Sequence, residues 1–343
     1  MRLPTQVGGF SHPPVLKMEP NFILKPLHSN NRGLRELAFY EAIRTCCSSS
    51  FRIDNEVANY LESMRINTIE EDTTENVGMF PTIGRNHAIT SWGILDKLVL
   101  WIATTLIPDP CLLDAENSLL LSRNILQKEV QMLRQLSHFV PSYHGLSPTA
   151  QGGDYIVLRD LTAHYTNPCV LDLKMGVQTY EPDDSWEKQV KNKCKYPQQE
   201  LFGLRIVGMR IICHDTTDDP QRYQLYDKHY GYSITSETQL QAAFRLYFTS
   251  NRQIQKSVIL EFTNQLQNIR SWFEQNQSLC FYSSSLLLVY DGCGNNDNAT
   301  SSRRPILRMI DLGHVRRNLG GDHGYLFGIQ TLEKHLQILL EGG

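Results

Sequence analysis

The sequence predicts an α+β fold of two lobes, with an antiparallel sheet in each lobe. A chain of 343 residues is long enough for one large domain or for two lobes. Its first part reads as strand, turn, strand and helix, and its later part alternates β-rich runs with amphipathic helices. No internal repeat is apparent in the sequence. We therefore expect an N-terminal lobe over residues 1–158 and a C-terminal lobe over residues 159–343.

The N-terminal lobe is predicted to begin with a strand and a helix. A strand is indicated by the alternation in NFILKPL, and the turn NNRG precedes the helix LRELAFYEAIR. In that helix Leu34, Leu37 and Ala38 recur at helical spacing. A second helix is predicted over LLLSRNILQKEVQMLRQL, and a strand over YIVLRDL closes the lobe.

Residues 46–124 differ in composition from the rest of this lobe. The stretch NTIEEDTTENVG is acidic and poor in apolar residues, so we expect a partly disordered insertion. The most apolar stretch of the chain, at 92–108, lies inside it. Asp96 and Lys97 interrupt that stretch, which leaves it short of the roughly 20 residues that span a bilayer. We therefore expect a packed amphipathic helix there.

The C-terminal lobe is predicted to alternate strands and helices. Strands are expected at PCVLDLKMG, GLRIVGMRIIC, SLLLVYDG and ILRMIDLG. A short basic helix, WEKQVKNKCKY, lies within a helical segment at about 183–200. Further helices are predicted over about 236–250, 253–276 and 329–341.

Composition narrows the classes of function. The formal net charge of −3 argues against broad binding of nucleic acid or of membrane surfaces. The eight cysteines contain no CxxC pair, so we expect reduced thiols and a place in the cytoplasm, the nucleus or both. The first residues lack a charged head followed by an apolar run, so no signal peptide is expected. The histidines show no HExxH or other spacing typical of metal ligands, so we expect no structural metal.

Two charges stand unusually close on one predicted strand. Asp172 and Lys174 are two residues apart in PCVLDLKMG, so in a strand they share a face with Val170. Unpaired charges in an apolar strand are costly unless something meets them. Two explanations are open at this point: a salt-bridged pair at the end of a strand, or a phosphate-handling site.

The order of further motifs is typical of a kinase-like enzyme. Lys25 lies on an early strand and Glu36 on the helix that follows, as in the kinase pair that holds the ATP phosphates. The segment YIVLRDL fits a hinge between lobes, and MIDLG around Asp311 resembles the element whose aspartate holds Mg²⁺. A protein kinase is disfavoured, because the sequence has no GxGxxG before Lys25, no HRDxxxxN and no APE.

The run from Pro168 to Gly176 resembles the PxxxDxKxG signature of the inositol polyphosphate kinase family. Other segments resemble the family in the same order: QVGGF, KPLHSNNRGLRELAFYEAI, FVPSYHG, YPQQELFGLRIVGMRI, DKHYG, SSSLLLVYDG, IDLGHV and DHGYLFGI. Together they cover about three quarters of the chain. The resemblance implies a two-lobed fold like that of protein kinases and ATP-grasp enzymes, with ATP between the lobes.

The resemblance also implies roles for individual residues. The catalytic residues would be Lys174 and Asp311, and Asp311 would also hold Mg²⁺. ATP would be bound by Lys25, Glu36, Asp160, Leu161, Asp172, Ser285 and Asp311. The substrate would be bound by Lys174, Lys188, Lys191, Asn192, Lys195, Arg210, Lys228 and His314.

The function implied is an ATP- and Mg²⁺-dependent kinase of soluble inositol polyphosphates, of the multikinase type that converts the trisphosphate to tetrakis- and pentakisphosphate. Lys191 and Asn192 fall where multikinases often carry glutamines, so an inositol hexakisphosphate kinase that forms pyrophosphates is the alternative. A third possibility is a pseudokinase or scaffold that binds partners through residues 46–124. We expect a monomer that binds a small-molecule substrate, with a phosphoinositide head group as a further candidate, and without nucleic acid or stable membrane insertion.

Overall fold

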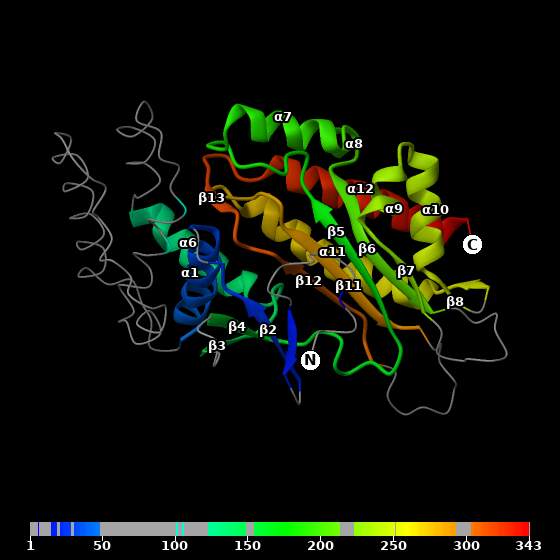
Figure 1. Cartoon of the computed structure of the whole chain (residues 1–343), viewed down its shortest axis with the longest axis horizontal. Coiled ribbons are helices and arrows are strands. Elements are labelled where there is room, and N and C mark those ends of the chain that lie inside the picture. The colour runs from blue at the N-terminus through cyan, green and yellow to red at the C-terminus, as the bar shows by residue number, and fades with distance from the viewer. Residues whose placement is uncertain are drawn as a thin grey trace.

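The computed structural model describes residues 6, 15–18, 21–28, 31–48, 101, 105, 123–148, 154–212, 223–250, 252–292 and 303–342, and every structural statement below concerns these residues (Figure 1). The predicted insertion at 46–124 lies almost wholly outside them. So do QVGGF, apart from Gln6, and the loop at 293–302. Among the described residues, no helix is long and apolar enough to cross a bilayer.

A four-stranded antiparallel sheet forms the first unit of the fold. Its strands are β1 (Leu16–Met18), β2 (Phe22–Pro26), β3 (Tyr143–Pro148) and β4 (Asp154–Arg159), in the spatial order β1-β2-β4-β3. Two helices, α1 (Asn31–Cys46) and α6 (Arg123–Leu136), pack against each other beside this sheet (Figure 1). Helix α1 is buried along nearly its whole length. It therefore fixes the position of Glu36 relative to the strand that carries Lys25.

A five-stranded antiparallel sheet forms the second unit. Its strands are β5 (Pro168–Met175), β6 (Leu204–Ile212), β7 (Tyr223–Tyr226), β11 (Ser285–Asp291) and β12 (Ile306–Ile310), in the spatial order β12-β11-β5-β6-β7. Strand β5, which carries the signature run, is the central strand. Leu171, Leu173 and Met175 are fully buried in the main core. Val170, Asp172 and Lys174 point to the opposite face, as the alternation predicts.

Helices cover the core face of this sheet. They are α10 (Glu237–Tyr247), α11 (Lys256–Gln275) and α12 (His323–Glu341), and α11 packs along α12 (Figure 1). Two shorter helices, α8 (Gln198–Phe202) and α9 (Lys228–Ser233), contact β6, and the helix α7 (Trp186–Lys195) precedes α8 in the chain. The basic helix predicted over 186–196 is confirmed as α7.

Three predicted helix ends are wrong. The helix expected over 236–250 ends at Tyr247, and the one expected from 253 begins at Lys256, because residues between them form the short hairpin β8 (Thr249–Ser250) and β9 (Gln253–Ile254). The last helix begins at His323 instead of 329, because Asp322 caps its first turn by accepting a hydrogen bond from the Tyr325 N–H. A small two-stranded antiparallel sheet pairs β10 (Leu279–Phe281) with β13 (Val315–Arg317), which lies after β11 and β12 in the chain.

Candidate functional site

A lysine and two carboxylates join the two sheets. Lys25, on β2, donates hydrogen bonds to Glu36 Oε1 and to Asp311 Oδ1, both at 2.6 Å. Asp311 directly follows β12, so this cluster connects the small sheet, helix α1 and the large sheet. The backbone of Asp311 has a φ of 61°, a left-handed conformation that costs a non-glycine residue about 1–3 kcal/mol and that is concentrated at functional sites.

The electrostatics of this cluster keep Lys25 and Asp311 charged. Burial lowers the pKa of Lys25, but the carboxylates of Asp311 and Glu36 outweigh burial and hold that pKa well above its usual range. Burial alone would raise the pKa of Asp311, yet the charge and the hydrogen bond of Lys25, together with Lys174, hold it below its usual range. Asp311 is therefore an anionic oxygen donor that stays charged at neutral pH.

Asp172 and Lys174 do not form the salt-bridged pair considered above. The Lys174 Nζ instead donates to the Ser283 carbonyl oxygen at 2.9 Å and to Ser283 Oγ at 3.0 Å. Burial, followed by the charge of Asp311, raises the pKa of Asp172 to about 6. Its Oδ1 is buried without a hydrogen-bond partner among the described residues. Both side chains are thus held by burial and geometry, and each keeps capacity to bind a ligand.

The predicted hinge follows β4. The Asp160 carboxylate accepts from the Thr162 N–H at 2.8 Å and from the Thr162 hydroxyl at 2.7 Å, so it shapes the local turn. Leu161 packs against a small apolar cluster that is separate from the main core, with Val170 and Val289 at its centre. This cluster lies on the face of the large sheet that also carries Asp172. A pocket of about 290 Å³ opens beside it; the lining includes Arg159, Asp160, Leu161, Ile306 and Arg308.

Ser285 stands opposite Lys174 on the neighbouring strand β11, and it is buried. A hydrogen bond from Ser285 counteracts the rise in the pKa of Asp172. The structure therefore brings Ser285 to the site, where it contacts a carboxylate of the chain.

His314 is held by a carboxylate that the sequence did not single out. Its Nδ1 lies 2.6 Å from Glu181 Oε1, in the segment between β5 and α7. Glu181 also accepts from Arg35 at 3.0 Å and from Arg316 Nε at 2.6 Å. Burial acts to raise the pKa of Glu181, but the hydrogen bond with His314 and the charges of Arg35 and Arg316 lower it to about 2. The stretch TYEPDD gave no signal for this role, because its partners come from α1 and from the segment after Asp311.

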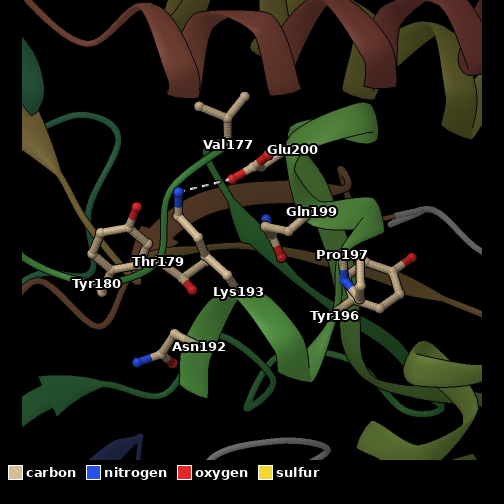
Figure 2. A pocket seen from close by; sticks show the side chains of 9 residues that line it. All are labelled: Val177, Thr179, Tyr180, Asn192, Lys193, Tyr196, Pro197, Gln199 and Glu200. Atoms are coloured by element: carbon tan, nitrogen blue, oxygen red, sulfur yellow. Dashed lines mark ion pairs between the residues drawn. The ribbon is translucent and has the colours of Figure 1, made fainter. Parts of the chain in front are cut away.

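The lysines of α7 differ in their partners. Lys188 pairs with Asp184, one turn earlier, whereas Lys191 is exposed. The Lys195 Nζ lies 5.8 Å from the centre of the Tyr232 ring. Asn192 donates to the Lys188 carbonyl oxygen at 2.9 Å and lines a second pocket of about 190 Å³. Figure 2 shows that pocket, where Lys193 reaches toward Glu200 at 3.6 Å.

Arg210 and Lys228 are not brought beside Lys174. Arg210 pairs with Val170, four residues before Lys174 along β5, which is about 13 Å at strand spacing. Its guanidinium stacks 3.4 Å above the centre of the Tyr223 ring. Lys228 is the exposed first residue of α9. The arginine that does stand opposite Lys174 is Arg205, which the sequence analysis missed.

The donor set suits a hard divalent cation. No group of three or more His, Cys, Asp or Glu side chains forms a metal cluster within the described part of the chain. A cation that bridges phosphate oxygens needs only one or two protein carboxylates. Asp311, which stays charged, fits that requirement as one such carboxylate.

Two sheets that meet at a Lys–Glu–Asp cluster define a two-lobed α+β protein of the kinase-like class. The family model for inositol polyphosphate kinase matches residues 155–337, and the chain belongs to this family. The human inositol polyphosphate multikinase is 35% identical over 163 residues, which are 47% of this chain and 38% of that protein. Human inositol hexakisphosphate kinase 3 is 30% identical over 217 residues, which are 55% of this chain and 52% of that protein. The chain thus spans only two fifths to half of the length of these relatives.

A solved structure shows the same fold. The inositol phosphate multikinase of S. cerevisiae, in complex with ADP and Mn²⁺, superposes with a TM-score of 0.52 at 22% identity. The superposition covers 60% of this chain and 90% of that one.

Proposed function

We propose that this protein is a kinase that transfers the γ-phosphoryl group of ATP to an inositol polyphosphate, with a divalent metal ion. The observation that carries the proposal is the cluster of Lys25, Glu36 and Asp311 between the two sheets, with Lys174 close enough to Asp311 for their charges to interact. Phosphoryl transfer needs positioning and charge neutralisation more than covalent chemistry by the protein. The cluster supplies one cation, one orienting carboxylate and one metal-binding carboxylate.

Each residue has a distinct part in the proposed reaction. Lys25 holds the ATP phosphates, and Glu36 on the buried helix α1 keeps Lys25 in place. Leu161 and the small apolar cluster around Val170 accept the adenine, and Asp172 accepts hydrogen bonds from the ribose. Lys174 is a point charge on a flexible stem, so it can follow the phosphoryl group as it passes to the acceptor hydroxyl.

A magnesium ion on Asp311 would neutralise charge on the phosphate oxygens. Lys25, which donates to Asp311 in this structure, would be free to contact phosphate once Asp311 holds the ion. His314, whose Nδ1 faces Glu181, presents its other ring nitrogen away from that carboxylate. A loose transition state makes little demand on a general base, and no residue is given that role.

The multikinase type is the main proposal for the acceptor, so the trisphosphate would be converted stepwise to the tetrakis- and pentakisphosphate. A hexakisphosphate kinase is the second candidate, favoured by the cations of α7 and by Arg205 beside Lys174. We further propose Mg²⁺ as the ion, a monomer as the working unit, and the cytoplasm or nucleus as its place.

A product assay tests the function directly. The protein is supplied with radiolabelled ATP and Mg²⁺, and with inositol trisphosphate or inositol hexakisphosphate separately. Stepwise products from the trisphosphate support the multikinase, and turnover of the hexakisphosphate alone supports the second candidate. No turnover of either acceptor, despite tight binding of ATP, contradicts the proposal and favours a scaffold.

The variant Lys174→Met tests the proposed catalytic residue. It keeps the apolar stem but removes the charge at the transferred group, so we expect kcat to fall by about a thousandfold or more. Lys193→Met is the matched control, since Lys193 faces the pocket of Figure 2 and pairs with Glu200. An activity near that of the wild type in Lys174→Met would remove Lys174 from the mechanism.

A further inference from the structure

Arg205 faces the candidate site because of an irregularity in strand pairing. Asp172 pairs with Gly208, but Leu173 pairs with Ile206 and Lys174 with Arg205, so the register shifts by one residue between Asp172 and Leu173. Such a β-bulge reverses the alternation of side chains beyond it. Without the bulge, Ile206 would stand opposite Lys174 and Arg205 would point into the core.

The surroundings of Arg205 are mainly aromatic, and the charge of Asp172 acts on its pKa without a direct ion pair. The guanidinium carbon lies 5.6 Å from the centre of the Tyr196 ring and 4.6 Å from that of Tyr232. Only 9% of the residue is exposed, and its Nε is buried without a hydrogen-bond partner. No carboxylate of the described residues lies within ion-pair distance of it. A buried guanidinium in this state calls for an anion.

Two more cations surround the same point. Burial lowers the pKa of Lys174, and the positive charges of Arg205 and Lys195 act in the same direction, against the pull of Asp311 and Asp172. Burial likewise lowers the pKa of Arg205. Tyr232 lies beside both Arg205 and Lys195. Three cations, Lys174, Arg205 and Lys195, therefore lie near one another at the end of β5. The rings of Tyr196 and Tyr232 lie on one side of them.

We propose that Arg205 is a substrate-binding residue that takes a phosphate group already present on the acceptor, next to the hydroxyl that receives the new one. The inference rests on the proposed function and specifies its substrate side. Lys174 contacts the phosphoryl group that is transferred, while Arg205 and Lys195 bind a phosphate already on the neighbouring carbon of the acceptor. The planar fork of Arg205 matches two phosphate oxygens, and stacking between tyrosines keeps the fork in place before the substrate binds.

Steady-state kinetics of Arg205→Met test this role. Methionine keeps an unbranched stem between the two rings but cannot bind phosphate. We expect the acceptor KM to rise about tenfold or more, the usual effect of losing a charge-assisted hydrogen bond. The KM for ATP should stay within about twofold of the wild-type value, because Arg205 is not proposed to contact ATP. Arg270→Met, the same change at a half-buried site on α11 outside the candidate site, should leave both KM values as in the wild type.

Arg205→Lys provides the second variant. It keeps the charge and loses the fork, so the acceptor KM should rise about threefold or more, less than for methionine. Equal increases in both KM values would indicate a merely structural role and overturn the proposal. An unchanged acceptor KM would overturn it as well. If Arg205→Met cannot be purified in a folded state, the acceptor KM of Arg205→Lys tests the proposal instead.

Failure of the proposed function can be told apart from failure of this inference. If the wild type turns over neither acceptor, calorimetric titration with inositol hexakisphosphate replaces the kinetics. Weaker binding in Arg205→Met than in the wild type supports the anion site even then. Equal binding contradicts it.

Discussion

Among single residues, Glu181 makes the most connections in the site. One buried carboxylate accepts from Arg35 on α1 and from Arg316 on β13, and it holds His314 by a ring nitrogen. It therefore connects the helix that carries Glu36 with the segment that carries Asp311. In the proposed reaction Glu181 would act on the substrate only through His314, so we propose that it is a positioning residue.

The variant Glu181→Gln should show a pH-dependent loss of stability. The pKa of Glu181 is lowered from 4.5 to about 2 in the folded protein. Its contribution to stability is thus fully present above about pH 4.5 and is lost as the pH falls toward 2. The depressed pKa corresponds to about 3 kcal/mol in the free energy of unfolding at pH 7. Urea unfolding of wild type and variant at pH 7, 4 and 3 measures it, and a difference that stays constant with pH contradicts the assignment.

At the scale of elements, α7 carries positive charge without packing into the core. None of its residues is buried. Its capping residue Ser185 accepts from the Lys188 N–H, so the helix is ordered from its first turn. Lys191 and Lys195 have no ion pair within the part of the chain that the structure describes, whereas Lys188 and Lys193 do. The helix can therefore lend two free cations to an anionic substrate.

The double variant Lys191→Gln/Lys195→Gln is expected to raise the acceptor KM about fivefold and to weaken its dependence on salt. Lys193→Gln removes a charge from the same helix on the side of the second pocket (Figure 2), and it should leave the acceptor KM unchanged. Initial rates at two ionic strengths measure both effects. Equal changes in the double variant and in the control would show that general helix charge, and not this face, matters.

Over the whole molecule, a buried ion pair connects distant parts of the chain. Arg317 on β13 donates through both terminal nitrogens to the Glu129 carboxylate on α6, and neither side chain is appreciably exposed. Trp101 adds a hydrogen bond to Glu129 Oε1 at 2.7 Å. This ion pair therefore connects β13, which follows Asp311 in the chain, to helix α6, which packs against α1.

Breaking this pair from one side should destabilise the protein strongly. Glu129→Gln and Arg317→Met each leave a buried polar group without its partner, at a cost of about 3–5 kcal/mol in the free energy of unfolding. The double variant Glu129→Gln/Arg317→Met leaves no lone charge and should lose much less than the sum. Urea unfolding of the four proteins completes the cycle. Additive losses would mean that the two residues act independently.

Local pattern predicted much of the fold and part of the candidate site. The strand alternation placed Asp172 and Lys174 on one face, and the motif order paired Lys25 with Glu36. The boundary at residue 158 and the roles of the individual site residues stay predictions. Two helix ends were wrong because the β8–β9 hairpin is shorter than any periodic signal, and a third because an aspartate cap starts α12 early.

The sequence by itself determined the family and most of the order of strands and helices, because these depend on neighbours along the chain. Tertiary structure alone decided the rest. Lys174 bonds to Ser283 instead of Asp172, and Glu181 gathers partners from three separate segments. Arg205 reaches the site only because a bulge shifts the register against β5. Such contacts depend on how distant strands pair, and spacing along the chain carries no record of that pairing.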